Sequence, residues 1–146
     1  MLRGRPALLT LWCLACLACL LREQARAFSR DALRQVETLR RQDAASCPGC
    51  KLYTPSVTDY TMCPRDTLKC FSAEVRVLLA EWEGSQRPGL ERALESFADH
   101  LGHSGRQCAP CELHPEEDVP RFLEQLYKTL QAFNNLEHRK DPTGPV

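Results

Sequence analysis

Two short cysteine pairs constrain the fold of this 146-residue chain more than any other feature. Cys63 and Cys70 lie seven residues apart at the start of an apolar helical pattern, and Cys108 and Cys111 lie three apart just before another. In a small secreted chain, cysteines at the ends of amphipathic helices usually cross-link the fold rather than react with a substrate. The pattern therefore favours extracellular recognition over catalysis.

The first 27 residues have the pattern of a cleaved secretory signal peptide. Arg3 and Arg5 precede an apolar run of 15 residues at 7–21, and Ala-Arg-Ala at 25–27 has the small-x-small form of a cleavage site. The run is shorter than the roughly 20 residues that a membrane-crossing helix needs. We therefore expect a secreted, extracellular protein that begins at Phe28 and has no membrane insertion.

After this leader, 119 residues remain, which is enough for one domain of ordinary size. Loss of the leader removes four arginines and one glutamate, so 15 basic and 18 acidic side chains remain and the net charge is −3. No basic stripe is left to follow phosphates, so we expect no nucleic-acid partner. The predicted domain covers 28–136, is a monomer, and precedes a flexible polar tail at 137–146.

Four stretches of the chain repeat apolar residues at the three- and four-residue spacing of a helix. The first should start at Ser29 or Asp31, which are suitable N-caps, and the second near Arg65. The third should start at Pro88, a favourable first-turn residue, and the fourth near Asp118. The predicted apolar residues are Leu33, Val36, Leu39, Leu68, Phe71, Val75, Leu78, Leu79, Trp82, Leu90, Ala93, Leu94, Phe97, Ala98, Leu101, Val119, Phe122, Leu123, Leu126, Leu130 and Phe133.

The connections between these helices differ in length. About 22 residues separate the first two helices and about 16 the last two, whereas only about four separate the second, which Gly84 should end, from the third. Long, short and long connections are what two overhand crossovers require. We therefore predict an all-α, short-chain four-helix bundle with up-up-down-down topology. Residues 53–62 contain Pro55 and should form at best a short edge strand.

The six cysteines after the leader allow 15 pairings. Cys63 and Cys70 are two helical turns apart on one side, so either of them could join Cys108 or Cys111. Two roughly parallel bridges, Cys63–Cys108 and Cys70–Cys111, would tie the second helix to the approach to the fourth.

Cys47-Pro-Gly-Cys50 would then remain, and it could close into a small disulfide ring. With the 108/111 pair it also has the spacing of a four-thiolate zinc site, but an oxidising compartment disfavours that interpretation. Redox-active pairs of this form start a helix in a βαβ unit, whereas this pair follows a helix. We therefore predict a structural turn, with no metal and no cofactor.

No grouping of residues typical of an enzyme occurs in the sequence. The four histidines are scattered through loops and helix ends, without a serine or cysteine motif beside them. The acidic run Glu116-Glu117-Asp118 precedes a predicted helix, where carboxylates usually form a solvated first turn. We therefore expect no catalytic residues.

Three motifs follow one another in a characteristic order, namely Lys51-Leu-Tyr-Thr54, Cys63-x6-Cys70-Phe71 and Cys108-x-x-Cys111-Glu112. With these motifs the chain resembles the interleukin-2/interleukin-15 family of short-chain helical cytokines, and its interleukin-15-like branch most closely. The resemblance extends over most of the mature chain. It implies the same bundle, the same two long-range bridges, and a secreted cytokine that brings receptor chains together on lymphoid cells.

The resemblance also implies that the interleukin-15 receptor alpha chain is held by the second helix and the two long connections. The matching residues are Tyr53, Glu74, Val77, Glu81 and Glu112. Glu74 and Glu81 share a helical face, where their charges could pair with basic receptor residues, and a solvated helix face is the plain alternative. Leu78 should belong to the core, and Val77 is better placed to be exposed.

By the same resemblance, the interleukin-2/15 receptor beta chain meets the first and third helices, and the common gamma chain meets the first and fourth. Gln131 matches the gamma-chain contact and should face outward, because core positions surround it. The beta-chain match departs from the family. Ala32 takes the place of an aspartate, with Asp31 one residue early, and Ala93 takes the place of an asparagine.

A secreted saposin-like lipid-binding domain is the alternative, because it is also helical, has six cysteines and opens with a C-x-x-C. Its last cysteine should close the final helix, whereas 35 residues and a whole helix follow Cys111 here. Bridges between the 47/50 pair and the 108/111 pair, or binding to lipid vesicles, would favour this alternative.

Overall fold

A computed structural model describes residues 5–42, 47–81, 89–103 and 105–139 of the chain. Most of these residues are helical, which confirms the predicted all-α class. In chain order the elements are α1 (Arg5–Arg41), β1 (Leu52–Tyr53), α2 (Val57–Met62), α3 (Pro64–Glu81), α4 (Gly89–His100), the 3₁₀ helix η2 (Cys111–Leu113), β2 (Glu116–Glu117) and α5 (Val119–Arg139).

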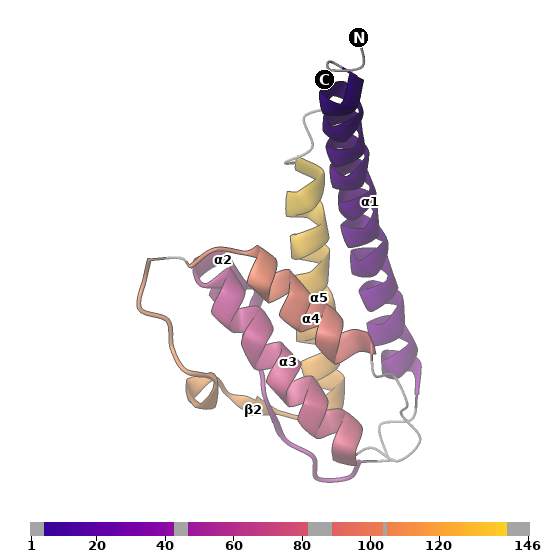
Figure 1. Ribbon diagram of the computed structural model, residues 1–146. Coiled ribbons are helices and arrows are strands. Elements are labelled where there is room, and N and C mark those ends of the chain that lie inside the picture. Colours follow the sequence, from indigo (N-terminus) through magenta and orange to yellow (C-terminus); the bar gives the residue numbers. More distant parts are fainter. Residues whose placement is uncertain (1–4, 43–46, 82–88, 104, 140–146) are drawn as a thin grey trace.

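The long helices pack chiefly as two pairs. α1 and α5 lie side by side, as do α3 and α4, and α1 also contacts α4 (Figure 1). The short helix α2 packs on α3 and α5. β1, from the connection before α2, pairs with β2, from the connection before α5, so the two long connections meet beside α3.

The interior is formed by the apolar faces of the helices together with Leu52 of β1. Phe71 of α3 and Phe122 of α5 meet with ring centroids 5.5 Å apart, and Phe97 of α4 stacks on Phe133 of α5 at 4.7 Å. Each fully buried leucine or phenylalanine contributes about 1.5–3 kcal/mol of hydrophobic stabilisation. The largest fully buried side chains are Val36, Leu39, Leu52, Leu68, Phe71, Leu78, Leu90, Leu94, Phe122, Leu123, Leu126 and Leu130.

Three of the long helices lie where the apolar spacing predicts them. α3 and α4 cover the second and third predicted helices, and α5 begins directly after Asp118, whose Oδ1 accepts a hydrogen bond from the Arg121 N–H at 3.0 Å. α5 also extends through 137–139 of the predicted tail. The roles predicted for Trp82, Gly84 and Pro88, and the rest of the tail, lie outside the described residues.

The predicted start of the first helix is wrong. α1 runs from Arg5 to Arg41 as one helix of 37 residues, so neither Ser29 nor Asp31 starts a helix in the full chain. Good helix formers connect the apolar run at 7–21 to the amphipathic segment, and the residues between them include no proline or glycine. In the part of the chain that the structure describes, no helix is long and apolar enough to cross a membrane.

The segment 53–62, expected to form at best a short edge strand, is mostly helical, although Tyr53 does lie in the two-residue strand β1. α2 begins after Ser56, whose hydroxyl accepts a hydrogen bond from the Asp59 N–H at 3.1 Å. The Asp59 carboxylate in turn accepts one from the Ser56 N–H at 2.7 Å. This reciprocal capping box starts a helix directly after Pro55, and Tyr60 then turns into the core.

The acidic run before α5 also differs from the prediction. Glu116 and Glu117 form β2 instead of a first helical turn, and they pair antiparallel with Tyr53 and Leu52 respectively. The Thr54 N–H continues this contact by donating to the Pro115 carbonyl oxygen at 2.8 Å. Tertiary pairing therefore overrides the local preference of carboxylates for a helix N-terminus.

The three predicted disulfides are confirmed. The pairs are Cys47–Cys50, Cys63–Cys108 and Cys70–Cys111, with Cα–Cα distances of 5.6, 6.1 and 5.3 Å. These pairings leave no free thiolate for the four-cysteine zinc site, because each of its four cysteines is already bonded. Disulfides of this kind fit an oxidising compartment.

Candidate functional site

A side chain of α3 holds β1 in place. The Oε2 atom of Glu74 accepts a hydrogen bond from the Tyr53 N–H at 2.8 Å. Successive N–H groups of a strand point to opposite edges, so the Thr54 N–H reaches the β2 side while the Tyr53 N–H points towards α3. Two residues that the sequence predicts for one site therefore do meet, through the backbone of Tyr53 and not through its ring.

The surroundings of the Glu74 carboxylate disfavour its charge. Partial burial raises the pKa of this carboxyl group, the hydrogen bond from Tyr53 acts in the opposite direction, and the charge of Glu116 raises the pKa further. Glu116 is the strand partner of Tyr53 and is exposed. Sequence reasoning missed it, because a two-residue strand leaves no alternating pattern to detect.

The next turns of α3 continue this surface. Val77 and Glu81 follow Glu74 by three and seven residues, so they lie on the same side of the helix. Val77 is 46% exposed whereas its neighbour Leu78 is 1% exposed, which confirms the predicted division between surface and core. Glu81, the last residue of α3, is exposed.

A groove of about 370 Å³ borders these residues. One side is the end of α3, with Val77 and Glu81, and the other is the segment 48–52, which contains Lys51 and three of the four residues of the Cys47–Cys50 ring. Gly49 has a φ of 81°, a left-handed conformation that favours glycine in so small a ring. The chain therefore runs along the exposed side of α3 from the ring to β1.

The third part of the surface is η2. The Cys70–Cys111 disulfide ties η2 to α3 one turn before Glu74, and η2 packs against α3 and β1. Its Glu112 is exposed. We call the surface formed by β1, its partner β2, the second half of α3 and η2 the disulfide face. Its residues are Tyr53, Glu74, Val77, Glu81, Glu112 and Glu116, of which four are acidic, and the exposed Lys51 lies beside them.

The candidate beta-chain residues on α1 and α4 do not form a comparable surface. Ala32 is 1% exposed and belongs to the core, so its side chain cannot serve as a surface contact. Asp31 is exposed and accepts a hydrogen bond from the Gln35 Nε2 atom at 2.9 Å. Ala93 is half-buried and packs against the core. Asp31 is therefore the accessible polar member of this set.

The candidate gamma-chain residue lies on the surface of α5. Gln131 is exposed, between the buried Leu130 and the partly buried Ala132. Its side chain is thus accessible, as the spacing of the core positions predicts.

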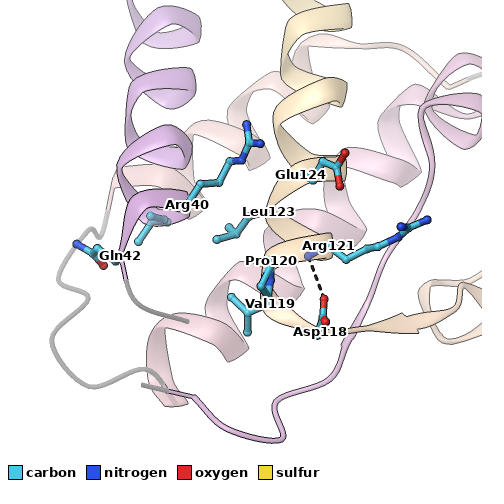
Figure 2. Close-up of a pocket in the computed structure, with 9 residues that line it drawn as sticks. Arg40, Gln42, Asp118, Val119, Pro120, Arg121, Leu123 and Glu124 are labelled. Carbon is cyan, nitrogen blue, oxygen red and sulfur yellow. Dashed lines mark hydrogen bonds between the residues drawn. The ribbon is translucent and has the colours of Figure 1, made fainter. Parts of the chain in front are cut away.

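A second groove, of about 400 Å³, lies where the end of α1 meets the start of α5 (Figure 2). Arg40 of α1 and Arg121 and Glu124 of α5 surround it, and Asp118 forms the helix cap drawn there as a dashed line. The Arg40 guanidinium also lies 5.0 Å from the ring centroid of Tyr127. Positive and negative groups alternate around this groove, so it offers no surface of one sign.

The described residues include no group of three or more His, Cys, Asp or Glu side chains that could hold a metal ion. The disulfide face carries an exposed aliphatic side chain, Val77, among carboxylates.

Comparison with known proteins does not name a relative. No protein-family model matches the chain, and no curated protein matches it. The geometry and charge of the disulfide face are therefore the basis for assigning a function.

Proposed function

We propose that this chain is a secreted cytokine of the interleukin-2/interleukin-15 type. It would act on lymphoid cells by binding the interleukin-15 receptor alpha chain and by joining the shared beta chain to the common gamma chain. The observation that carries this proposal is the disulfide face, because both long connections and the second half of α3 converge there on one acidic surface.

The course of the long helices supports the corresponding fold. In Figure 1, α1 and α3 run downwards and α4 and α5 run upwards. The connection from α1 to α3 and the connection from α4 to α5 each join helices of the same direction, and both are long. An up-up-down-down four-helix bundle has this order of directions, with two long crossovers. We therefore propose that topology, with α2, η2 and the β1–β2 pair as additions carried by the two crossovers.

The acidic character of the disulfide face suggests the chemistry of its partner. Glu81 and Glu112 are exposed, and Val77 provides an apolar contact between the carboxylates. A receptor surface with basic side chains around a small apolar depression would complement this arrangement. Complementary charge accelerates encounter and fixes the register of the complex, and the burial of Val77 adds affinity.

The proposed contacts with the gamma chain and the beta chain each depend on one exposed residue. For the common gamma chain we propose Gln131 on α5, which is accessible. For the beta chain we propose Asp31, since the adjacent Ala32 is buried. A helix contact that relies on a single polar side chain should be weaker than one that has two. We therefore expect lower affinity for the beta chain than in family members that carry both the aspartate and the asparagine.

The disulfides do not favour the saposin-like alternative. Bridges between the 47/50 pair and the 108/111 pair would have favoured it, whereas Cys47 bridges Cys50, Cys108 bridges Cys63 just before α3, and Cys111 bridges Cys70 of α3. We therefore do not propose lipid binding as a second function.

Binding to the immobilised interleukin-15 receptor alpha ectodomain tests the proposal. The full chain is expressed in secretory cells, and the protein from the medium is compared with Glu81→Lys and with Glu95→Lys, a charge reversal at another exposed position, on α4. We expect binding by the unmodified protein, a loss of about tenfold or more in Glu81→Lys, and unchanged binding in Glu95→Lys. The absence of binding by folded, disulfide-bonded protein would refute the proposed receptor.

A further inference from the structure

We infer that Glu74 is a positioning residue, which shapes the disulfide face by holding β1 on α3, and that its charge is not what the receptor recognises. This inference rests on the proposed function for its consequence in binding, but its structural part can be tested without any receptor. It divides the two glutamates that share the exposed side of α3 into different roles. Glu74 supplies a hydrogen-bond acceptor, and Glu81 supplies the charge.

The first support is the direction of the hydrogen bonds around β1. One edge of this strand is paired with β2, and the contact continues at Thr54. The other edge presents the Tyr53 N–H to α3, where only a side chain can accept a hydrogen bond because the helix backbone is already paired within itself. The Glu74 Oε2 atom does so at 2.8 Å.

The second support is the nature of the other contacts of β1, which are a short strand pairing and apolar packing. Both strands contain two residues, and a pair this short is marginal without other packing. Leu52 is buried on one side of Tyr53, and the small Cys47–Cys50 ring lies just before it. The long-range Cys70–Cys111 bridge fixes η2 but not β1 itself. The hydrogen bond from Tyr53 to Glu74 is a direct polar link between β1 and α3.

The third support is electrostatic. Partial burial and the neighbouring Glu116 both raise the pKa of Glu74, while the hydrogen bond from Tyr53 lowers it, and the net effect disfavours the charged form relative to a freely solvated glutamate. A residue selected for its charge would be better placed in full contact with solvent, as Glu81 is. A glutamine at position 74 keeps a carbonyl oxygen for the Tyr53 N–H and removes the repulsion from Glu116.

The test compares substitutions that separate charge from hydrogen bonding. In the disulfide-bonded protein from the full chain, Glu74→Gln should bind the interleukin-15 receptor alpha ectodomain within about twofold of the unmodified protein, whereas Glu74→Ala should lose about tenfold. Glu81→Gln is the matched control, and it should weaken binding more than Glu74→Gln does. Equal losses in Glu74→Gln and Glu74→Ala would show that the charge is recognised directly, and would overturn the inference.

Hydrogen exchange of the Tyr53 amide provides the second readout, without receptor. Its protection should fall by about tenfold in Glu74→Ala and persist in Glu74→Gln and in Glu81→Ala. Unchanged protection in Glu74→Ala would overturn the positioning role even if binding were lost. If the unmodified protein does not bind the receptor, the proposed function fails, and the exchange measurement alone decides whether Glu74 holds β1.

Discussion

The disulfide face and the contact between α1 and α5 are held together in different ways. At the disulfide face and next to it, two bridges with sequence separations of 45 and 41 residues, a two-residue strand pair and the Tyr53–Glu74 hydrogen bond fix segments with little secondary structure of their own. The described residues of α1 and α5 share no disulfide, and they pack through apolar side chains such as Val36 and Leu39.

The two regions therefore contribute different properties: the α1–α5 contact mainly contributes stability, and the disulfide face contributes a surface of fixed shape. Apolar packing between long helices tolerates small adjustments and mainly contributes free energy. Cross-linked connections gain their fixed geometry from covalent and directional bonds, which is what a recognition surface built from loops requires. We therefore expect damage at the α1–α5 contact to lower stability alone, and damage at the disulfide face to lower receptor binding as well.

The largest expected effect comes from removal of a long-range bridge. Cys63→Ala/Cys108→Ala should lower the free energy of unfolding by about 3 kcal/mol, because with Cys70–Cys111 intact the bridge closes a loop of roughly 12 residues in the unfolded chain. Cys47→Ala/Cys50→Ala, which opens a four-residue ring, should lower it by only about 2 kcal/mol. Denaturant unfolding measures both values, and equal losses would contradict the loop-length argument.

The next effect tests the α1–α5 contact. Leu39 is buried at the end of α1, beside the groove drawn in Figure 2. Leu39→Ala should lower the free energy of unfolding by about 3 kcal/mol through lost burial and a cavity, with unchanged affinity of the folded protein for the receptor alpha chain. Arg34→Ala, an exposed substitution on the same helix, should stay within about 0.5 kcal/mol. Reduced receptor affinity of folded Leu39→Ala would contradict the proposal that the α1–α5 contact contributes stability alone.

A smaller effect is expected at the edge of the same contact. The Arg40 guanidinium lies over the Tyr127 ring at 5.0 Å from its centroid, and both side chains are at least partly accessible. Arg40→Gln should therefore cost about 0.5–1 kcal/mol in stability, the usual range for an accessible cation–π contact. In a Tyr127→Leu background the same substitution should cost less, and an equal cost in both backgrounds would argue against the contact.

The smallest effect concerns the pH dependence of Glu74. Because its pKa is raised in the folded protein, the folded state binds a proton more readily than the unfolded state, and stability falls as pH rises from the unfolded to the folded pKa. Glu74→Gln should remove this loss, so it should be slightly more stable than the unmodified protein at pH 7 and equal to it below about pH 4. Thermal unfolding at several pH values measures the difference, and a variant that is less stable at pH 7 would contradict it.

Strong periodicity made the helices predictable. Regular apolar spacing places α3, α4 and α5, and the division between Val77 and Leu78 follows from the same spacing. The start of α1 was not predictable in this way, since Ser29 and Asp31 are suitable caps but the backbone simply continues through them. A cap residue marks a position at which a helix can start, but it does not require the preceding residues to be non-helical.

The parts that the sequence analysis missed depend on contacts between distant segments. The strand pair joins residues 52–53 to 116–117, and neither segment is long enough to show alternation. The contact between Tyr53 and Glu74 spans 21 residues and uses a backbone donor, which no side-chain pattern reports. α2 was predictable in principle from the Ser56-x-x-Asp59 capping box, but Pro55 just before it is also typical of an edge strand, the structure predicted for this segment.

The most direct measurement is a hydrogen-exchange footprint of the interleukin-15 receptor alpha ectodomain on the disulfide-bonded protein. The proposed function and the role of the disulfide face predict added protection at 48–54 and over the second half of α3, with little change in the central turns of α1 and α5. Protection confined to α1 and α5, or no protection at all, would contradict the assignment of receptor recognition to the disulfide face.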